Sequence, residues 1–231
     1  MHLFLSPHYD DAIYSCGGVI CHLVQAGDNV TILTIMAGEP QPPFPKTPVL
    51  QDNHVRWQAG ENPVQIRRDE DRVAANILGV TTHYLDILDC IYRTDDEIAL
   101  YPSEESLWHT IHRKDNTLEQ LKMTSLPEAD IVYVPFGVGA HVDHLIVRDF
   151  GLHLVNTGHD VTFYIDYPYM RSTDAIDKAR DAFSHSVAIE ARVFSEEAMQ
   201  HKIDAMSAYE TQIASFWESR AAIAPEVRRT F

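Results

Sequence analysis

Basic residues are scarce in this 231-residue sequence, which has 18 Lys and Arg against 34 Asp and Glu and a formal net charge of −16. General electrostatics therefore argues against partners that are polyanions, such as nucleic acids or anionic membrane surfaces. Long apolar runs are also missing, since none reaches the roughly 18 residues of a transmembrane helix, and we expect no membrane insertion. These absences exclude two classes of partner but identify no substrate.

Cysteine is scarce as well, with Cys16, Cys21 and Cys90 as the three examples. The first residues lack a basic n-region and read as a strand rather than as a signal peptide. An odd number of cysteines without a secretion signal indicates reduced thiols and a cytoplasmic location. Cys16 could be a ligand or nucleophile, but a small buried helix residue is the favoured interpretation.

Repeats and low-complexity tracts are not evident, and 45% hydrophobic residues suit a single domain over residues 1–231. Apolar patterns predict strands over 2–6, 30–36, 83–88, 130–135, 161–166 and 187–193. They predict helices over 12–26, 65–78, 104–122, 144–156 and 174–184, and a helical C-terminal segment over 195–220 with one or two helices in 195–218. This alternation indicates a Rossmann-like α/β fold, with a mostly parallel sheet and helices on both faces.

Residues 38–63 are rich in Pro, Gln, Asn and Gly and are predicted to form a long loop. A loop of this length is often functional, so it either borders a site or contacts another subunit. A disordered insertion is an equally acceptable interpretation.

Two motifs with side chains that bind metals lie about 130 residues apart, PHYDD at residues 7–11 and HVDH at residues 141–144. Together they offer two imidazoles and a carboxylate for one metal, with another imidazole and carboxylate beside them. This is the equipment of a zinc-dependent hydrolase with an open coordination position for water. Both motifs follow expected strands, and such sheets bind ligands beyond the carboxyl ends of their strands.

In the first motif Asp10 and Asp11 point to opposite sides if the segment is extended. One carboxylate can then bind the metal while the other faces the water as a general base. The structural alternative is a helix N-cap, which an Asp-Asp pair after a strand often forms. The presence of His8 and of the second motif favours the metal site.

In the second motif His141 and His144 lie on one face if the chain turns into a helix here, so one can bind metal while the other points at substrate. Asp143 can hydrogen-bond to a histidine ring, fix its tautomer and raise its pKa. A protonated imidazole could then stabilise an oxyanion or protonate a leaving amine. The alternative is a surface turn, because thirteen histidines make chance pairs expected.

With both motifs, the chain resembles the PIG-L/LmbE-like N-acetylglucosamine deacetylases, zinc-dependent amidohydrolases with a Rossmann-like fold. The resemblance covers essentially the whole chain and includes Gly17-Gly18 after the first motif. Two weaker blocks agree, one between Arg67 and Gly79 and one between Lys202 and Gln212.

The resemblance implies that His8, Asp11 and His144 are ligands of a Zn²⁺ ion. Fe²⁺ or another divalent metal is also possible, because this ligand set suits several of them. It implies that Asp10 is the general base that activates water.

The resemblance also implies that His141 stabilises the tetrahedral oxyanion or acts as an acid, with Asp143 tuning it. Arg67 matches a position that contacts substrate in relatives, and Asp89 matches an acid that contacts the sugar. For Arg67 the structural alternative is a helix-surface ion pair with Glu70.

The sequence departs from the family pattern at three positions. The family often has Pro where Tyr9 stands and Glu where Ala12 stands, and neither position carries the metal or the base. The acid that is usually followed closely by Gly stands here in the sequence DCI at residues 89–91, which bears on substrate choice.

The resemblance implies a hydrolase of amide bonds that removes an N-acetyl or other N-acyl group from an amino sugar or its conjugate. A small-molecule amino sugar is therefore the expected substrate, while the sugar, acyl length and oligomeric state, including a possible homo-oligomer, stay open. One alternative is a metal-dependent hydrolase of a non-sugar amide or a phosphoester, and another is a non-catalytic carbohydrate-binding protein. Nucleotide binding is not expected, because the Gly-rich phosphate fingerprint is missing.

Overall fold

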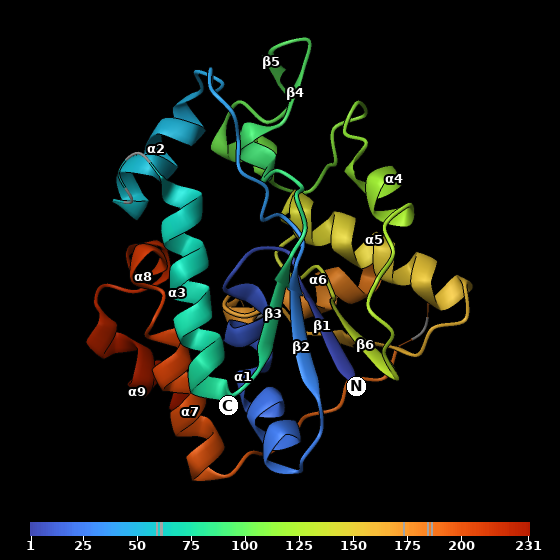
Figure 1. Cartoon of the computed structure of the whole chain (residues 1–231), viewed down its shortest axis with the longest axis vertical. Coiled ribbons are helices and arrows are strands. Elements are labelled where there is room, and N and C mark those ends of the chain that lie inside the picture. Colours follow the sequence, from blue (N-terminus) through green and yellow to red (C-terminus); the bar gives the residue numbers. More distant parts are fainter. Residues whose placement is uncertain (59, 61, 173, 184, 186) are drawn as a thin grey trace.

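Five short strands form a parallel sheet at the centre of the molecule (Figure 1). The computed structural model describes residues 1–58, 60, 62–172, 174–183, 185 and 187–231. The sheet has the order β3-β2-β1-β6-β7, and every neighbouring pair is parallel. Its strands are β1 (His2–Ser6), β2 (Val30–Thr34), β3 (Thr81–Tyr84), β6 (Ile131–Pro135) and β7 (Val161–Tyr164).

Alternating side chains of the sheet face two apolar layers, because successive residues of a strand point to opposite faces. Phe4 and Ile32 belong to one apolar cluster, whereas Leu3, Leu5 and Leu33 belong to another. Four helices contribute to the first cluster, namely α1 (Asp11–Gln25), α3 (Pro63–Leu78), α7 (Glu196–Met206) and α9 (Ile223–Thr230). Helices α4 (Thr117–Lys122) and α5 (Val142–Asn156) cover the second (Figure 1). The Rossmann-like α/β prediction is therefore confirmed.

Strands β1 and β6 are neighbours in the sheet although about 130 residues separate them in the sequence. After β1 the next strand, β2, lies on one side of this pair, and after β6 the next strand, β7, lies on the other side. The strand order thus reverses between β1 and β6, and ligands of such sheets bind at this reversal. The two motifs at 7–11 and 141–144 follow these two strands.

The segment 38–63 contains a helix, so the prediction of a long loop is wrong in part. Helix α2 (Pro48–Trp57) begins after Thr47, whose side chain accepts a hydrogen bond from the Leu50 amide at 3.3 Å. Pro48 occupies the first turn, where the lack of an N–H costs nothing. Val49 and Leu50 are buried, as is Trp57. Pro48 therefore marks the start of a helix, although the prolines of this segment had indicated a loop.

The predicted helix over 104–122 is also wrong, because two short elements replace it. A 3-10 helix, η2 (Glu104–Leu107), is separated from α4 by an irregular segment. His109 in this segment has a φ of 71°, which ends any helix. Asp115 accepts hydrogen bonds from Arg93 and from the Tyr101 hydroxyl, each at 2.7 Å. Contacts distant in sequence therefore hold the segment in its irregular form.

Two strand predictions need correction. The strand expected over 83–88 is β3 (Thr81–Tyr84), which starts two residues earlier and is shorter. Residues 187–193 form no strand and are mostly exposed, and β7 is the edge of the sheet in the part of the chain that the structure describes.

The helical C-terminal segment holds two helices, α7 and α8 (Glu210–Phe216), followed by η4 (Arg220–Ala222) and α9. The remaining elements are η1 (Cys90–Tyr92), β4 (Thr94–Asp95), β5 (Ile98–Ala99), η3 (Tyr169–Arg171) and α6 (Ala175–Asp181). In the part of the chain that the structure describes, no helix is both long and apolar enough to cross a membrane.

Candidate metal centre and active site

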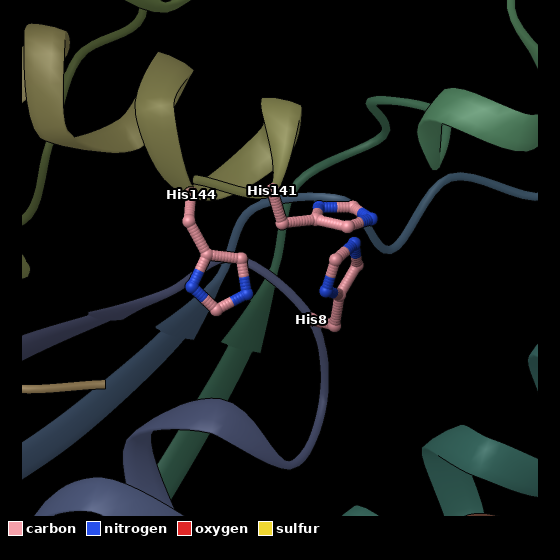
Figure 2. Close-up of side chains that lie close together, drawn as sticks. All are labelled: His8, His141 and His144. Carbon is pink, nitrogen blue, oxygen red and sulfur yellow. The ribbon is translucent and has the colours of Figure 1, made fainter. Parts of the chain in front are cut away.

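Three buried histidines meet where β1 and β6 end (Figure 2). His8 lies in the turn after β1, His141 is the N-cap of α5, and His144 lies in the first turn of that helix. One ring nitrogen from each lies within 4.8 Å of the others. The fold thus joins the two motifs at one point.

Asp11 lies between two of these rings. Its Oδ2 atom is 3.3 Å from His8 Nδ1 and 3.3 Å from His144 Nε2. The backbone N–H of His8 donates to the same oxygen at 2.7 Å and fixes the carboxylate. Two ligand atoms that are each about 2.0–2.1 Å from a tetrahedral ion lie about 3.4 Å apart. The spacings of Asp11 from His8 and from His144 therefore suit ligands of one divalent cation.

The other nitrogen of each of these histidines faces a buried carboxylate. His8 Nε2 lies 2.9 Å from Asp143 Oδ2, and His144 Nδ1 lies 2.6 Å from Asp166 Oδ1. A carboxylate accepts hydrogen bonds, so each of these two nitrogens holds a ring proton, and in the neutral ring that a metal would bind the other nitrogen carries a lone pair. The lone pairs of His8 Nδ1 and His144 Nε2 are then directed at Asp11, as in metal sites with carboxylate–histidine pairs.

Three acceptors thus meet in a buried space, which a cation would stabilise. His144 Nε2 is buried and makes no hydrogen bond to any described residue. Burial lowers the pKa of His144, but the charges of Asp11 and Asp166 outweigh it and raise this pKa to about 10. The position therefore attracts positive charge, and the residues fit a divalent metal. His141 adds a further nitrogen, so His8, His141 and His144 are a second possible set.

Asp143 bonds to a histidine ring, as expected, but the ring is that of His8 and not that of His141. Besides His8, its carboxylate accepts from the Arg93 guanidinium and from the Cys90 amide, the latter at 3.2 Å. Although burial raises its pKa, Arg93 and His8 hold the pKa of Asp143 below its ordinary value. The acid is therefore a charged partner of His8 and Arg93.

His141 is a neutral imidazole rather than the protonated ring that we expected. Burial, together with the nearby His8, lowers the pKa of His141 to about 3. Its Nδ1 accepts a hydrogen bond from the Asp143 backbone N–H at 3.3 Å. This bond leaves the ring proton on Nε2, and His141 lines the cleft above the site. A neutral donor at this place can stabilise an oxyanion.

Asp10 is buried at the N-cap position of α1, but its side chain makes no cap hydrogen bond. Asp10 therefore occupies the N-cap position that the structural alternative proposed, but its carboxylate does not cap the helix. Burial and the neighbouring charge of Asp11 raise the pKa of Asp10 to about 6, although Arg67 lowers it. A carboxylate with such a pKa is suited to accept a proton near neutral pH.

Arg67 is a buried residue of the site, so the surface ion pair with Glu70 is wrong. Its Nη2 lies 3.3 Å from Asp10 Oδ1, and its Nη1 lies 3.8 Å from Asp89 Oδ2. Glu70 accepts instead from the backbone N–H and hydroxyl of Thr211, at 2.8 and 2.6 Å. The substrate contacts assigned to Arg67 and Asp89 stay predictions, and both residues line the cleft.

A cleft of about 300 Å³ opens over these residues. Its walls combine charged and polar side chains with four aromatic ones, Trp57, Trp108, Tyr169 and Phe216. The Trp108 ring packs edge-on against His141 at 5.1 Å between centroids, and a short antiparallel bridge joins the two backbones. The cleft can therefore hold a group larger than the amide itself.

Asp166, Trp57 and Trp108 were missed by the sequence analysis. Asp166 follows β7 at the carboxyl end of a strand, the same signal that located the two motifs. It stands without a neighbouring histidine in sequence, so nothing local indicated its role. The two tryptophans lie in the segments whose helices were misplaced.

The PIG-L family model, described as GlcNAc-PI de-N-acetylase, matches residues 3–155. The 2'-N-acetylparomamine deacetylase of Niallia circulans is 28% identical over 183 residues, which cover 72% of this chain and 66% of that protein. The enzyme of the same name from Streptomyces fradiae is 31% identical over 182 residues, which cover 77% of this chain and 61% of that protein. The chain therefore spans less than two thirds of the length of these relatives. The zinc-inhibited form of teicoplanin deacetylase Orf2 shares the fold, with a TM-score of 0.76 and 24% identity over 96% of this chain and 88% of that one.

Proposed function

The chain belongs to the PIG-L family of de-N-acetylases, and we propose that it is a metal-dependent hydrolase that removes an N-acetyl group from an amino sugar or its conjugate. The observation that carries the proposal is the position of Asp11 Oδ2, 3.3 Å from the free nitrogens of two carboxylate-bound histidines. Asp10 and His141 stand beside this point. The two curated relatives, both named deacetylases, support the same activity.

His8, Asp11 and His144 would hold the metal, which we propose to be Zn²⁺, with Fe²⁺ as another candidate. When bound, the metal would lower the pKa of water from about 15.7 to roughly 7 and polarise the amide carbonyl. Cleavage of an amide with neither of these effects is far slower, so loss of the ligands should abolish activity.

Asp10 moves the proton in the proposed reaction. It accepts a proton from the water whose oxygen forms a bond to the amide carbon. The C–N bond of the tetrahedral species then breaks, and Asp10 returns the proton to the departing nitrogen. The products are acetic acid and the free amine, which at neutral pH exchange a proton to give acetate and an ammonium group, so atoms and charges balance. Arg67, 3.3 Å from Asp10, keeps the carboxylate charged before the reaction.

His141 stabilises the negative oxygen of the tetrahedral species as a hydrogen-bond donor. Its Nδ1 is occupied by the Asp143 N–H, so the ring proton is on Nε2, which lies 3.9 Å from the Cys90 sulfur, and the ring lines the cleft. A neutral donor is suited to this role because it does not compete with Asp10 for the transferred proton. A single donor of this kind contributes about 10²–10³ in rate in other hydrolases.

The substrate that we propose is a small molecule with an N-acetyl amino sugar joined to a second group. The names of the curated relatives point to this class. The aromatic walls at Trp57, Trp108 and Phe216 support it, because aromatic rings pack against sugar rings and apolar groups. Arg67 and Asp89 would contact the sugar hydroxyls.

We further propose a cytoplasmic location, which the three free and buried cysteines support.

The proposal is tested by acetate release from a panel of N-acetyl amino sugars, their conjugates and one non-sugar acetamide. The wild type is compared with Asp10→Asn, and the metal content of both is measured. We expect wild-type turnover on at least one sugar substrate and a loss of about 10²–10⁴-fold in Asp10→Asn, with equal metal content. An active Asp10→Asn enzyme would exclude this mechanism, and turnover of the non-sugar acetamide alone would exclude the sugar substrate.

A further inference from the structure

Cys90 lies beside the catalytic histidine and has no part in the proposed reaction. Its side chain is fully buried in η1, directly after Asp89. The sulfur is 3.9 Å from His141 Nε2 and 3.5 Å from Asp89 Oδ1. Cys90, His141 and Asp143 also offer one donor atom each within 4.8 Å of one another. The surroundings of the thiol thus contain one imidazole and two carboxylates.

A thiolate, an imidazole and a carboxylate form a donor set that zinc and other thiophilic cations prefer. Sulfur and nitrogen ligands at about 2.3 and 2.0 Å from a tetrahedral ion lie about 3.5 Å apart. The observed 3.9 Å between Cys90 Sγ and His141 Nε2 therefore needs only a small closure.

Asp89 is the more accessible of the two carboxylates, because it lines the cleft whereas Asp143 is fully buried. Asp89 Oδ1 accepts from the Ile91 N–H at 3.2 Å, and Asp89 Oδ2 lies 3.8 Å from Arg67 Nη1. Asp143 already accepts hydrogen bonds from Arg93, His8 and the Cys90 amide. Asp89 and His141 both line the cleft, so a cation can reach them from solvent. The Cys90 sulfur lies behind them, in contact with both.

We propose that Cys90, His141 and Asp89 form a second site for a thiophilic divalent cation, such as excess Zn²⁺ or Cd²⁺, and that its occupation inhibits hydrolysis. On binding, the Cys90 thiol releases its proton to solvent and the sulfur bonds the ion. The ring proton of His141 moves from Nε2 to Nδ1, so His141 can no longer donate to the oxyanion. The inhibition rests on the proposed function, whereas binding of the cation does not.

The second site binds more weakly than the first. The shift of the ring proton to Nδ1 breaks the 3.3 Å hydrogen bond from the Asp143 N–H, and burial of the Cys90 thiol raises its pKa. In His8, Asp11 and His144, by contrast, the lone pairs already converge. The two sites should therefore fill in order, with the inhibitory one filling at excess metal.

The test is a Cd²⁺ titration of wild type, Cys90→Ser, His144→Ala and Cys21→Ser. Ultraviolet absorption reports the bond between thiolate and cadmium, and equilibrium dialysis with elemental mass spectrometry reports the ions per chain. Cys21→Ser is the matched control, because it removes a thiol of α1 that lies away from the site. Near-ultraviolet circular dichroism checks that each variant is folded.

We expect the wild type and Cys21→Ser to bind a second ion with a thiolate band, and Cys90→Ser to bind one ion without the band. Zn²⁺ should inhibit Cys90→Ser only at concentrations higher by roughly 10–100-fold than for wild type. A second ion or band retained in Cys90→Ser would overturn the site, as would a wild type without a band. In His144→Ala we expect the band to persist while the tight ion is lost. A tight ion retained in His144→Ala would refute the proposed catalytic centre and leave the Cys90 site standing.

Discussion

Asp166→Asn should weaken metal binding although Asp166 is not a ligand. Asp166 Oδ1 accepts from His144 Nδ1 at 2.6 Å, and its Oδ2 accepts from the backbone N–H groups of Gly137 and Val138 at 2.8 and 2.9 Å. Both side chains of the Asp166–His144 pair are about 1% exposed, so water cannot replace either bond. All three groups around Asp166 are donors, and only a carboxylate accepts from all of them.

An amide accepts at one end alone, so Asn at this position has two unfavourable orientations. If its oxygen faces the two backbone N–H groups, its NH₂ faces His144 Nδ1 and moves the ring proton to Nε2, which then cannot bind metal. If its oxygen faces Nδ1, its NH₂ opposes two backbone donors, which destabilises the loop by about 1–3 kcal/mol. The first orientation keeps more bonds, and we expect the metal affinity to fall by roughly 10–100-fold.

The assay is competition for Zn²⁺ between the protein and a chromophoric chelator, with thermal unfolding of the metal-free protein alongside. Asp149→Asn is the matched control, because Asp149 lies on the surface of α5 and bonds only to its neighbour Arg148 among the described residues. Asp166→Asn protein that is folded and binds Zn²⁺ as tightly as the control would refute the reasoning. His144 would then not be a ligand through Nε2.

Three further predictions follow from the buried charges. In metal-loaded enzyme kcat/KM should fall on the acid side as Asp10 becomes protonated, because burial raises the pKa of Asp10. A profile with no acidic limb above about pH 4 would contradict Asp10 as base. Arg67→Gln should move this acidic limb to higher pH, because Arg67 lowers the pKa of Asp10, and it should also raise KM. Arg67→Lys should restore the limb in part. An unmoved limb in Arg67→Gln would exclude the influence of Arg67 on the pKa of Asp10. Burial raises the pKa of Asp71 to about 7, so the folded protein holds this proton more tightly than the unfolded chain. The bound proton therefore adds up to about 4 kcal/mol to the free energy of unfolding below pH 4. This contribution is lost as the pH rises to about 7. Asp71→Asn should flatten that slope in urea unfolding, and an unchanged slope would contradict the assignment.

Much of the site could be predicted because it obeys local rules. His8, Asp11 and His144 lie in short motifs, and each motif follows an apolar run that the fold places at the centre of a parallel sheet. Carboxyl ends of neighbouring parallel strands meet, so two motifs distant in sequence had to come close once β1 and β6 paired.

The partners of these residues could not be predicted, because they are set by packing across the sheet. Asp143 is adjacent to His144 in the sequence, yet its carboxylate bonds to His8, which is 135 residues away. Asp166 approaches His144 only after β7 has joined the sheet beside β6. Arg93, which pairs with Asp143, carries no local signal of its role.

The misplaced elements have similar causes. Helix α2 was concealed by the prolines around it, although Thr47-Pro48 is a good helix start. The segment 104–122 has a helical composition, but Asp115 is held by Arg93 and Tyr101 from outside the segment. Such contacts override local propensity and are invisible in a single sequence.

The metal content of the purified protein tests the central claim most directly, measured by elemental mass spectrometry on wild type and on His144→Ala prepared alike. The account predicts about one tightly bound zinc or iron per wild-type chain, and its loss in His144→Ala. Retention of the metal in the variant, or its absence from wild type after careful reloading, would contradict the account.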